Sequence, residues 1–411
     1  MICVIIDDQL VDVTSILRWH PGGSYCLESN NGCDVTDVFH AIHRNVNFSP
    51  LVVETVVSDA TKAHVQDFRK LHRWMKEMGW YYPDKLHFFK HASMECFLFV
   101  FSMYCTFSNM PIMGAFLLGV FWHHSAGIGH DLGHSSVFKT RQTNFLIGSL
   151  LSTVTGLSSS WWRHSHFQHH IHTNILNEDP DIMHLPIFAI TERLFTHDFH
   201  NFLKVPMQSN ALTKALVTLQ HITLYPILYL ARFNLYVQSV SHIVSFNEVP
   251  SSAVFYRIER FGIAVFFCWY ALVLWYVAQW KDVILYVLIS HITSGILHVQ
   301  IAVSHWASET YDDHTTDHYQ HTLNTTLDID CSERMDWFYL GLQFQVTHHL
   351  YPRLPRYRLR EATQYVRQIC EKHQLTYKTV DFQEANLLLY ATMKMTSERL
   401  RANFKKIEYK K

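Results

Sequence analysis

The sequence predicts a small α+β module at the N-terminal end, followed by an all-α domain that crosses a membrane several times and carries a histidine-rich cap. Three observations lead to this fold class. Short apolar runs with turn residues occupy the first 57 residues, and long apolar stretches occur in pairs farther along the chain. The 30 histidines include spaced groups close to these stretches.

The first element is a compact module over residues 1–57. The runs "ICVII" and "LVDV" predict strands, "PGG" predicts a tight turn, and "DVTDVFHAIH" predicts a helix with an acidic start. The opening "MICVIIDDQL" is too short an apolar run, with acids too early, for a secretory signal. We therefore expect it to begin the first strand of a folded domain.

A linker over residues 58–92 follows, with an amphipathic helix predicted at 61–79. Its apolar side chains recur at helical spacing: Val65, Phe68, Leu71, Met75 and Met78. Such a helix can lie on a membrane surface or pack against the rest of the protein, and the pattern leaves both interpretations open.

The main domain, expected at 93–390, contains two apolar hairpins. Residues 93–107 and 111–129 form the first, and residues 261–280 and 282–303 form the second, with Trp and Tyr at its edges. Four spans would leave both termini and the long loops on one side of the membrane.

Two further apolar stretches are ambiguous. Residues 144–162 are rich in Ser, Thr and Gly, and residues 216–236 carry His221 and Arg232. Re-entrant or interfacial placement fits them as well as a span. Residues 391–411 are expected to form a basic C-terminal tail.

Three histidine groups have spacings that place their side chains on one face of a helix. In "GHDLGHSS" the histidines stand at i and i+4, in "HFQHH" three fall within an arc of about 100°, and in "QVTHH" a glutamine takes the place of one histidine. His164 and His172, which flank the second group, point away from that arc. The members of the three groups are His130 and His134; His166, His169 and His170; Gln345, His348 and His349.

A fourth histidine pattern runs along the last apolar stretch. His291, His298 and His305 recur every seven residues, so neighbours lie about 10 Å apart along a helix axis. Only one of them can reach a given metal, and His305, at the loop end, is the candidate. His291 and His298 are candidates for a polar pathway or for a buried structural role.

These groups predict a centre with two metal ions. Seven histidine ligands exceed what one tetrahedral zinc takes, and no H-E-x-x-H motif is present. Many imidazoles beside a membrane favour redox-active iron. The eight cysteines show no CxxC and are expected to form no disulfides, and the net charge of −1 argues against nucleic acid as a partner.

The set "HDLGH", "HFQHH" and "QVTHH" resembles the three histidine boxes of membrane fatty-acyl and sphingolipid desaturases, and a glutamine-led third box is typical of their front-end subfamily. "HPGG" followed by "DVTDVFHAIH" resembles the cytochrome b5 domain fused to that subfamily. The resemblance implies that the eight box residues from His130 to His349 named above, Gln345 among them, are catalytic. Their histidines, together with His305, would bind metal.

For the N-terminal module, the resemblance implies that His20 and His43 are the axial haem ligands, within a signature that includes Pro21, Gly22 and Gly23. The family's cytochrome domain has another strand and helix ahead of "ICVIIDDQLVDVT", so we expect a truncated module here. Whether it retains haem is left open.

The resemblance also implies cofactors, partners and location. These are haem b, two non-haem iron ions, dioxygen as co-substrate, and electrons from NADH through cytochrome b5 reductase. The chain would be a multi-pass protein of the endoplasmic reticulum membrane with its haem domain and histidine boxes in the cytosol. Stretches such as "NEDPDIMHLPIFAI" and "HVQIAVSHWA" are most similar to fungal delta-8 sphingolipid desaturases, which act on the long-chain base of ceramide.

Three alternatives remain. An acyl front-end desaturase of the delta-5 or delta-6 type shares the boxes, and a membrane diiron lipid hydroxylase shares the histidine clusters. A haem-binding membrane protein with structural histidines is the alternative that is not an enzyme.

Overall fold

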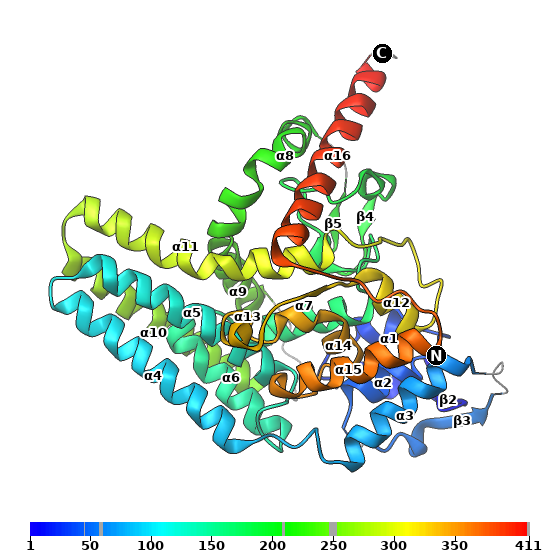
Figure 1. Cartoon of the computed structure of the whole chain (residues 1–411). Coiled ribbons are helices and arrows are strands. Elements are labelled where there is room, and N and C mark those ends of the chain that lie inside the picture. The colour runs from blue at the N-terminus through cyan, green and yellow to red at the C-terminus, as the bar shows by residue number, and fades with distance from the viewer. Residues whose placement is uncertain (45, 57–60, 208–209, 246–252, 409–411) are drawn as a thin grey trace.

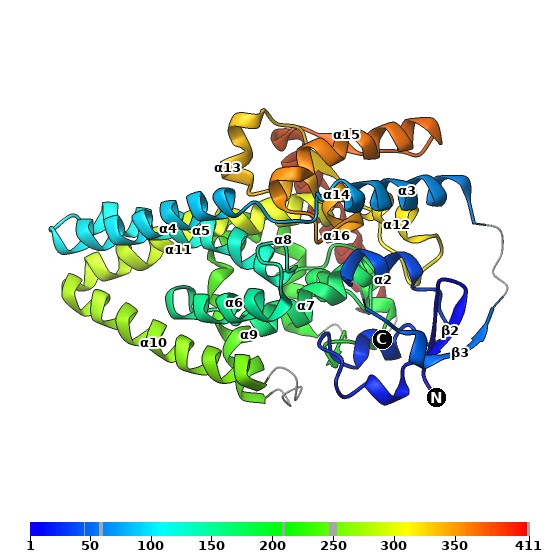
Figure 2. The same cartoon turned by 90° about the horizontal axis from the view of Figure 1, so that it is seen from below.

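The computed structural model describes residues 1–44, 46–56, 61–207, 210–245 and 253–408, with only the backbone helix described for 403–408. The boundary expected between residues 57 and 58 and the end of the tail at 411 lie outside these residues. Figures 1 and 2 show a group of long helices that extends away from a helical cap, with the N-terminal module against the cap.

The N-terminal module is built on a three-stranded antiparallel sheet in the order β1 (Cys3–Ile6), β2 (Gln9–Asp12), β3 (Val52–Thr55). Asp7 and Asp8 turn the chain between β1 and β2 with φ of 50° and 59°, a conformation that Asp tolerates better than most residues. Two helices, α1 (Tyr25–Glu28) and α2 (Thr36–Ile42), complete the module. Its small core contains Val4, Ile6, Val11 and Val13.

The linker helix packs on protein. Helix α3 (Ala63–Glu77) lies beside α15 (Arg356–Lys372) in both views (Figures 1 and 2). Four of the five residues that define its apolar face are buried in the cluster that α3 shares with α15: Val65, Phe68, Leu71 and Met75. Met78 follows the helix and is 60% exposed. Of the two interpretations of this helix, packing against the cap is the one that the structure adopts.

Four long helices make up the extended group in Figure 1: α4 (Lys85–Phe107), α5 (Pro111–Gly133), α10 (Ala253–Val277) and α11 (Trp280–His305). Among the described residues, three of them, α5, α10 and α11, are long and apolar enough to cross a membrane. The expected first span at 93–107 is not among them. It belongs to a helix that starts earlier, and Lys90 and Glu95 interrupt the apolar character of α4.

The two ambiguous stretches each divide into two helices. Helix α6 (Arg141–Thr155) ends at Gly156, whose φ of 72° reverses the chain before α7 (Ser159–Ile171). With 15 residues, α6 is about 22 Å long, shorter than the roughly 30 Å hydrocarbon core. The second stretch divides at Ala231 into α8 (Ala211–Leu230) and α9 (Arg232–Ser245). These breaks fit interfacial segments.

The cap is formed by the remaining elements. Its helices are α12 (His318–Thr325), α13 (Asp336–Tyr339), α14 (Gln345–Leu350), α15 and α16 (Phe382–Glu408). Its short strands are β4 (Phe199–His200), β5 (Val205–Pro206), β6 (Asp328–Ile329) and β7 (Thr379–Val380), with β4–β5 antiparallel and β6–β7 parallel. Its short 3-10 segments are η3 (Pro180–Ile182), η4 (Glu192–Thr196), η6 (Glu333–Met335) and η7 (Leu342–Phe344). The N-terminal module contains η1 (Thr14–Ile16) and η2 (Ser49–Leu51).

The expected boundary between the main domain and a basic tail falls inside α16. Met393 and Leu400 of this helix are buried in the largest apolar cluster, together with residues of α8 and α11. Thr396 donates a hydrogen bond to the carbonyl of Ile190 at 3.0 Å. Residues 391–400 are therefore part of the folded cap, because one face of the helix continues to be buried beyond residue 390.

Candidate functional site

A first group of four histidines joins three helices. His130 lies in the last turn of α5 and His134 directly follows that helix, His166 lies in α7, and His348 lies in α14. One ring nitrogen from each lies within 4.8 Å of the others. The i and i+4 spacing brings the first pair together, with ring centroids 4.7 Å apart, and the fold adds the other two.

A second group contains His169 of α7, His305 at the end of α11 and His349 of α14. Their ligand atoms also lie within 4.8 Å of one another, and all three side chains are buried. Of the three histidines spaced seven residues apart on α11, His305, the metal candidate, thus lies among the box histidines. His291 instead stacks on Phe233 with centroids 4.3 Å apart, and His298 donates to the carbonyl of Gly295 at 3.3 Å.

His170 lies between the two groups. Its Nε2 is 3.0 Å from Nε2 of His166 in the first group, and its ring stacks on that of His349 in the second, with centroids 4.2 Å apart. Its ring centroid is also 4.8 Å from those of His134 and His348. The second histidine box therefore contributes to both groups, because a single helical face points at the space between them.

The nitrogen spacings fit metal coordination. Nε2 of His130 and Nε2 of His348 lie 3.1 Å apart, and the His166 to His170 pair is similar. Two metal–nitrogen bonds of about 2.1 Å at a right angle place their nitrogens about 3.0 Å apart. Within the described residues, several buried ring nitrogens here have no hydrogen-bond partner: both nitrogens of His134, Nδ1 of His170 and His305, and Nε2 of His349. Buried nitrogens are normally paired, so an unpartnered nitrogen on each of these rings suits a metal ion.

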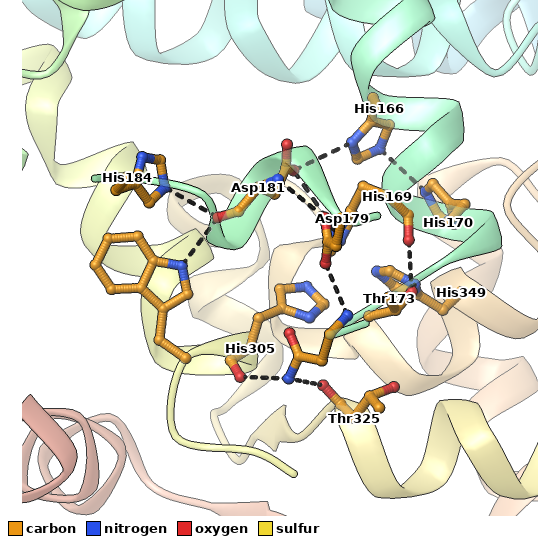
Figure 3. Close-up of polar contacts among 12 residues, drawn as sticks. His166, His169, His170, Thr173, Asp179, Asp181, His184, His305, Thr325 and His349 are labelled. Carbon is orange, nitrogen blue, oxygen red and sulfur yellow. Dashed lines mark hydrogen bonds and ion pairs between the residues drawn. The ribbon is translucent and has the colours of Figure 1, made fainter. Parts of the chain in front are cut away.

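Residues of a loop after α7 orient the second group (Figure 3). Asp179 is fully buried, and both of its carboxylate oxygens lie 3.0 Å from Nδ1 of His169. Thr173 donates its hydroxyl hydrogen to the carbonyl of His169 and accepts a hydrogen bond from Nδ1 of His349 at 3.2 Å. Both imidazoles therefore present Nε2 to the centre, an arrangement that is typical of metal-binding histidines.

Asn174 connects this loop to the end of α11. Its side-chain amide donates to the carbonyls of His305 and Glu309 at 2.9 and 3.0 Å, and its backbone N–H donates to Asp179 at 2.7 Å. Sequence reasoning did not identify Asp179, Thr173 or Asn174 as site residues. They belong to an irregular loop, where helical periodicity gives no signal, and the stretch "NEDPD" was the only indication of carboxylates near the second box.

The protonation states of the box histidines differ in a way that follows from their surroundings. Burial and the neighbouring imidazoles hold the pKa of His134, His170, His348 and His349 well below its ordinary range. These rings are therefore neutral, which is the form that binds metal. For His169, burial opposes the charged form, but the carboxylates of Asp179 and Asp181 outweigh it and raise the pKa to about 9.

Gln345 is buried at the start of α14, where the third box begins. It lines a narrow cavity together with His130, Asp131, His348 and Arg356. Asp131 accepts a hydrogen bond from Nε of Arg356 at 2.6 Å, which leaves the glutamine beside an ion pair on one side of the first group.

A separate histidine pair lies in the N-terminal module. The rings of His20 and His43 have centroids 5.9 Å apart, and each Nδ1 donates to a backbone carbonyl at 3.1 Å, those of Gly23 and Phe39. Each Nε2 is thus available, and two bonds of about 2 Å to one iron would place the ring centroids about 6 Å apart. Burial lowers the pKa of both rings, to about 4 for His43, so both are neutral.

Pro21, Gly22 and Gly23 form the turn that follows His20. Gly23 has a φ of 84°, which disfavours a side chain, and Gly22 lies against the His20 ring. His40 lies one turn before His43 in α2 but points to Asp7, with Nε2 2.9 Å from the carboxylate. The residues present fit a haem iron held by two histidines.

Comparisons with known proteins match both parts of the chain. Residues 108–381 match the family "Fatty acid desaturase", and residues 1–82 match the family "Cytochrome b5-like Heme/Steroid binding domain". The second match extends to residue 82, beyond the boundary expected at residue 57.

Several curated proteins are similar over most of the chain. "Delta(8)-fatty-acid desaturase 2" of Arabidopsis thaliana is 33% identical over 95% of this chain and 89% of its own length. "Acyl-lipid (9-3)-desaturase" of Borago officinalis is 33% identical over 97% of this chain and 90% of its own length. "Delta 8-(E)-sphingolipid desaturase" of Candida albicans is 34% identical over 79% of this chain and 57% of its own length.

Proposed function

The chain belongs to the fatty acid desaturase family and carries a cytochrome b5-like domain at its N-terminal end, and we propose that it introduces a double bond at carbon 8 of the sphingoid base of ceramide. The enzyme class, an oxidoreductase that desaturates lipids, follows from the family and from relatives of that name. The Candida albicans relative and that of Kluyveromyces lactis, both 34% identical, are named for delta-8 sphingolipid desaturation, which supports the proposed position and substrate.

The single observation that carries the proposed mechanism is the pair of histidine groups with His170 between them. We propose that His130, His134, His166 and His348 hold one iron ion and that His169, His305 and His349 hold a second. His170 would bind at their junction, and Gln345 would contact the first site directly or through water. Bound iron supplies the dioxygen chemistry that a methylene group requires, because such a group has no acidic proton for general base catalysis.

The residues of the chain have three tasks in this reaction. Asp179 and Thr173 hold the rings of His169 and His349 with Nε2 toward the centre. The burial of His134, His170 and His348 keeps water away from the reacting atoms. The apolar helices α5, α10 and α11, long enough to cross a membrane, would bring the site close to the lipid from which the substrate chain enters.

The N-terminal module supplies electrons. His20 and His43 would hold haem b, which would supply electron transfer. The proposed external source is NADH through cytochrome b5 reductase. The chain is an integral membrane protein, and we place it in the endoplasmic reticulum membrane with the haem module and the histidine cap in the cytosol.

One alternative substrate has specific support. The Borago officinalis relative, as similar as those of Arabidopsis thaliana, is named as an acyl-lipid desaturase. A fatty acyl chain would enter the same site and differ from a sphingoid base only at the headgroup.

Mass spectrometry of lipids from a yeast strain that lacks sphingolipid desaturation separates these substrates. Expression of the full chain is expected to yield a long-chain base that is two mass units lighter, with the double bond at carbon 8. The variant His169→Ala serves as the matched control and is expected to yield none. A new unsaturated fatty acid with unchanged bases would identify the acyl substrate, and a hydroxylated base would identify a hydroxylase.

A further inference from the structure

Two histidines that flank the second box, His164 and His172, belong to neither metal group. Both contact the N-terminal module. Nε2 of His172 lies 3.1 Å from the hydroxyl of Ser29, and the imidazole of His164 hydrogen-bonds to the backbone carbonyl of Gly22. The box helix α7 thus has one face toward the metal groups and another toward the module.

The contact at His164 is close. A Cβ added at Gly23 would lie 3.0 Å from Cε1 and 3.2 Å from Nδ1 of His164, a tight contact, and the φ of 84° at Gly23 disfavours a side chain independently. Gly22 and Gly23 directly follow the haem-ligand candidate His20. His164 precedes the metal-ligand candidate His166 by two residues in the same helix.

A second contact repeats this arrangement on the other haem ligand. Nη1 of Arg353 donates to the backbone carbonyl of His43 at 2.7 Å. Arg353 lies just beyond α14, whose residues His348 and His349 belong to the two metal groups. Arg353 and His43 also line one cavity of about 160 Å³ between α2 and α3.

Each haem-ligand loop is therefore held by one hydrogen bond to a box helix or to the segment directly after one. His20 is tied through Gly22 and His164 to α7, and His43 is tied through its own carbonyl and Arg353 to the segment after α14. Other contacts cross the same interface. Arg44, next to His43, donates to the carbonyl of Lys139 at 2.9 Å, an exposed contact in the loop between α5 and α6.

We propose that His164 and Arg353 are positioning residues for electron transfer within the chain. They hold the two haem-ligand loops against the two iron-ligand helices. This inference rests on the proposed function. In each transfer one electron leaves ferrous haem, which becomes ferric, and reduces the iron centre. Two such electrons and the two removed with the hydrogens of the substrate reduce one dioxygen to two waters, with four protons taken up from the substrate and solvent.

Stopped-flow measurement of haem oxidation tests the proposal on the full chain, loaded with haem and iron, in phosphatidylcholine nanodiscs that contain dihydroceramide. The haem is reduced without oxygen by NADH and a catalytic amount of cytochrome b5 reductase, and is then mixed with dioxygen. His169→Ala gives the rate of direct haem oxidation. The test variants are His164→Leu and Arg353→Met, which remove the donors and keep apolar bulk.

We expect both variants to keep the haem spectrum, haem midpoint potential and iron content of the wild type. Their rate of haem oxidation above the His169→Ala background should fall at least about tenfold, because small displacements at a reacting pair have effects of that order. His164→Gln and Arg353→Lys, which retain a donor, should restore most of the rate. Arg44→Ala, which removes another interface bond, should match the wild type.

Wild-type rates in both test variants would overturn the proposal, and so would an equal loss in Arg44→Ala. If His164→Leu or Arg353→Met loses haem or iron, the donor-retaining variants His164→Gln and Arg353→Lys test the proposal instead. A rate of haem oxidation in these loaded proteins equal to the His169→Ala background would contradict the role of the donor. A wrong substrate assignment gives a different result from a wrong assignment of His164 and Arg353. In that case no 8-unsaturated base forms in yeast, whereas the variants still slow oxygen-dependent haem oxidation.

Discussion

Nδ1 of His169 lies 3.0 Å from each carboxylate oxygen of Asp179, although ten residues and the end of a helix separate them in sequence. The same carboxylate accepts the backbone N–H groups of Asn174 and Asp181 at 2.7 and 2.9 Å. Asp179 thus connects the loop geometry to the orientation of one imidazole.

Asp179→Asn is expected to weaken metal retention at the second group about 10- to 100-fold, the usual effect of losing such a carboxylate. The amide has one acceptor oxygen, so its NH₂ group faces one of the three donors, which are Nδ1 of His169 and the backbone N–H groups of Asn174 and Asp181. Iron per chain after dialysis against a chelator measures the effect. Asp330→Asn is the control, because that carboxylate is exposed. Equal iron retention in Asp179→Asn and wild type would contradict the prediction.

His20→Ala is expected to abolish the haem absorption spectrum, since one of two axial ligands is lost. His40→Ala should leave it unchanged, because Nε2 of His40 bonds to Asp7 and the side chain is 48% exposed. Absorption spectra of the purified chains, normalised to protein, compare the two. A spectrum that survives in His20→Ala and disappears in His40→Ala would reverse the assignment.

Glu259→Gln is expected to lower the free energy of unfolding by about 2–4 kcal/mol, because buried donors lose their acceptor. Glu259 is fully buried in α10 and accepts hydrogen bonds from the hydroxyls of Ser149, Ser158 and Ser160 at 2.8, 2.6 and 2.9 Å. Ser158 also caps α7, so the second box should lose order.

Thermal unfolding in detergent, followed by tryptophan fluorescence, measures this change. The exposed Glu333→Gln provides the control. A melting temperature for Glu259→Gln equal to that of the control would show that the carboxyl does not stabilise the start of α7.

Asp328→Asn is expected to remove part of the pH dependence of stability. Burial raises the pKa of Asp328 from 3.8 to about 7, while its contacts with Tyr377 and the N–H of Val346 oppose that rise. The folded state therefore binds the proton more tightly than the unfolded chain. The contribution of the Asp328 carboxyl to the free energy of unfolding is fully present below about pH 4 and is lost as the pH rises to about 7.

Melting temperatures between pH 5 and 8 should therefore fall less in Asp328→Asn than in the wild type. Asparagine keeps an acceptor for the N–H of Val346, which lies 2.9 Å away at the start of the third box. Asp330→Asn, at an exposed position on the same strand end, should retain the wild-type dependence. Parallel curves of melting temperature against pH for the wild type, Asp328→Asn and Asp330→Asn would contradict the prediction.

Local spacing was sufficient to predict much of the candidate site. His130 and His134 share a face because an α-helix repeats every 3.6 residues, and the same rule groups His166, His169 and His170. It also separated His164 and His172 from that group and limited the stripe on α11 to one candidate, His305. These are statements about one helix at a time.

Other features required the packed structure. The first span was expected at 93–107, but α4 begins at Lys85, and its polar residues make it less apolar than α5. The tail boundary at 390 was misplaced because α16 remains buried to Leu400. Periodicity cannot distinguish burial against protein from exposure to lipid or water.

The sequence by itself determined the α+β start, the apolar helices, the three boxes and the histidines that face one another within each helix. These properties depend on neighbours a few residues apart, where backbone geometry alone decides which side chains meet. Only the tertiary structure decided which box residues form each metal group, that Asp179 and Thr173 orient them, and that His164 and Arg353 contact the haem-ligand loops. Those relationships join segments separated by up to 310 residues, and they arise from packing between elements that no local pattern encodes.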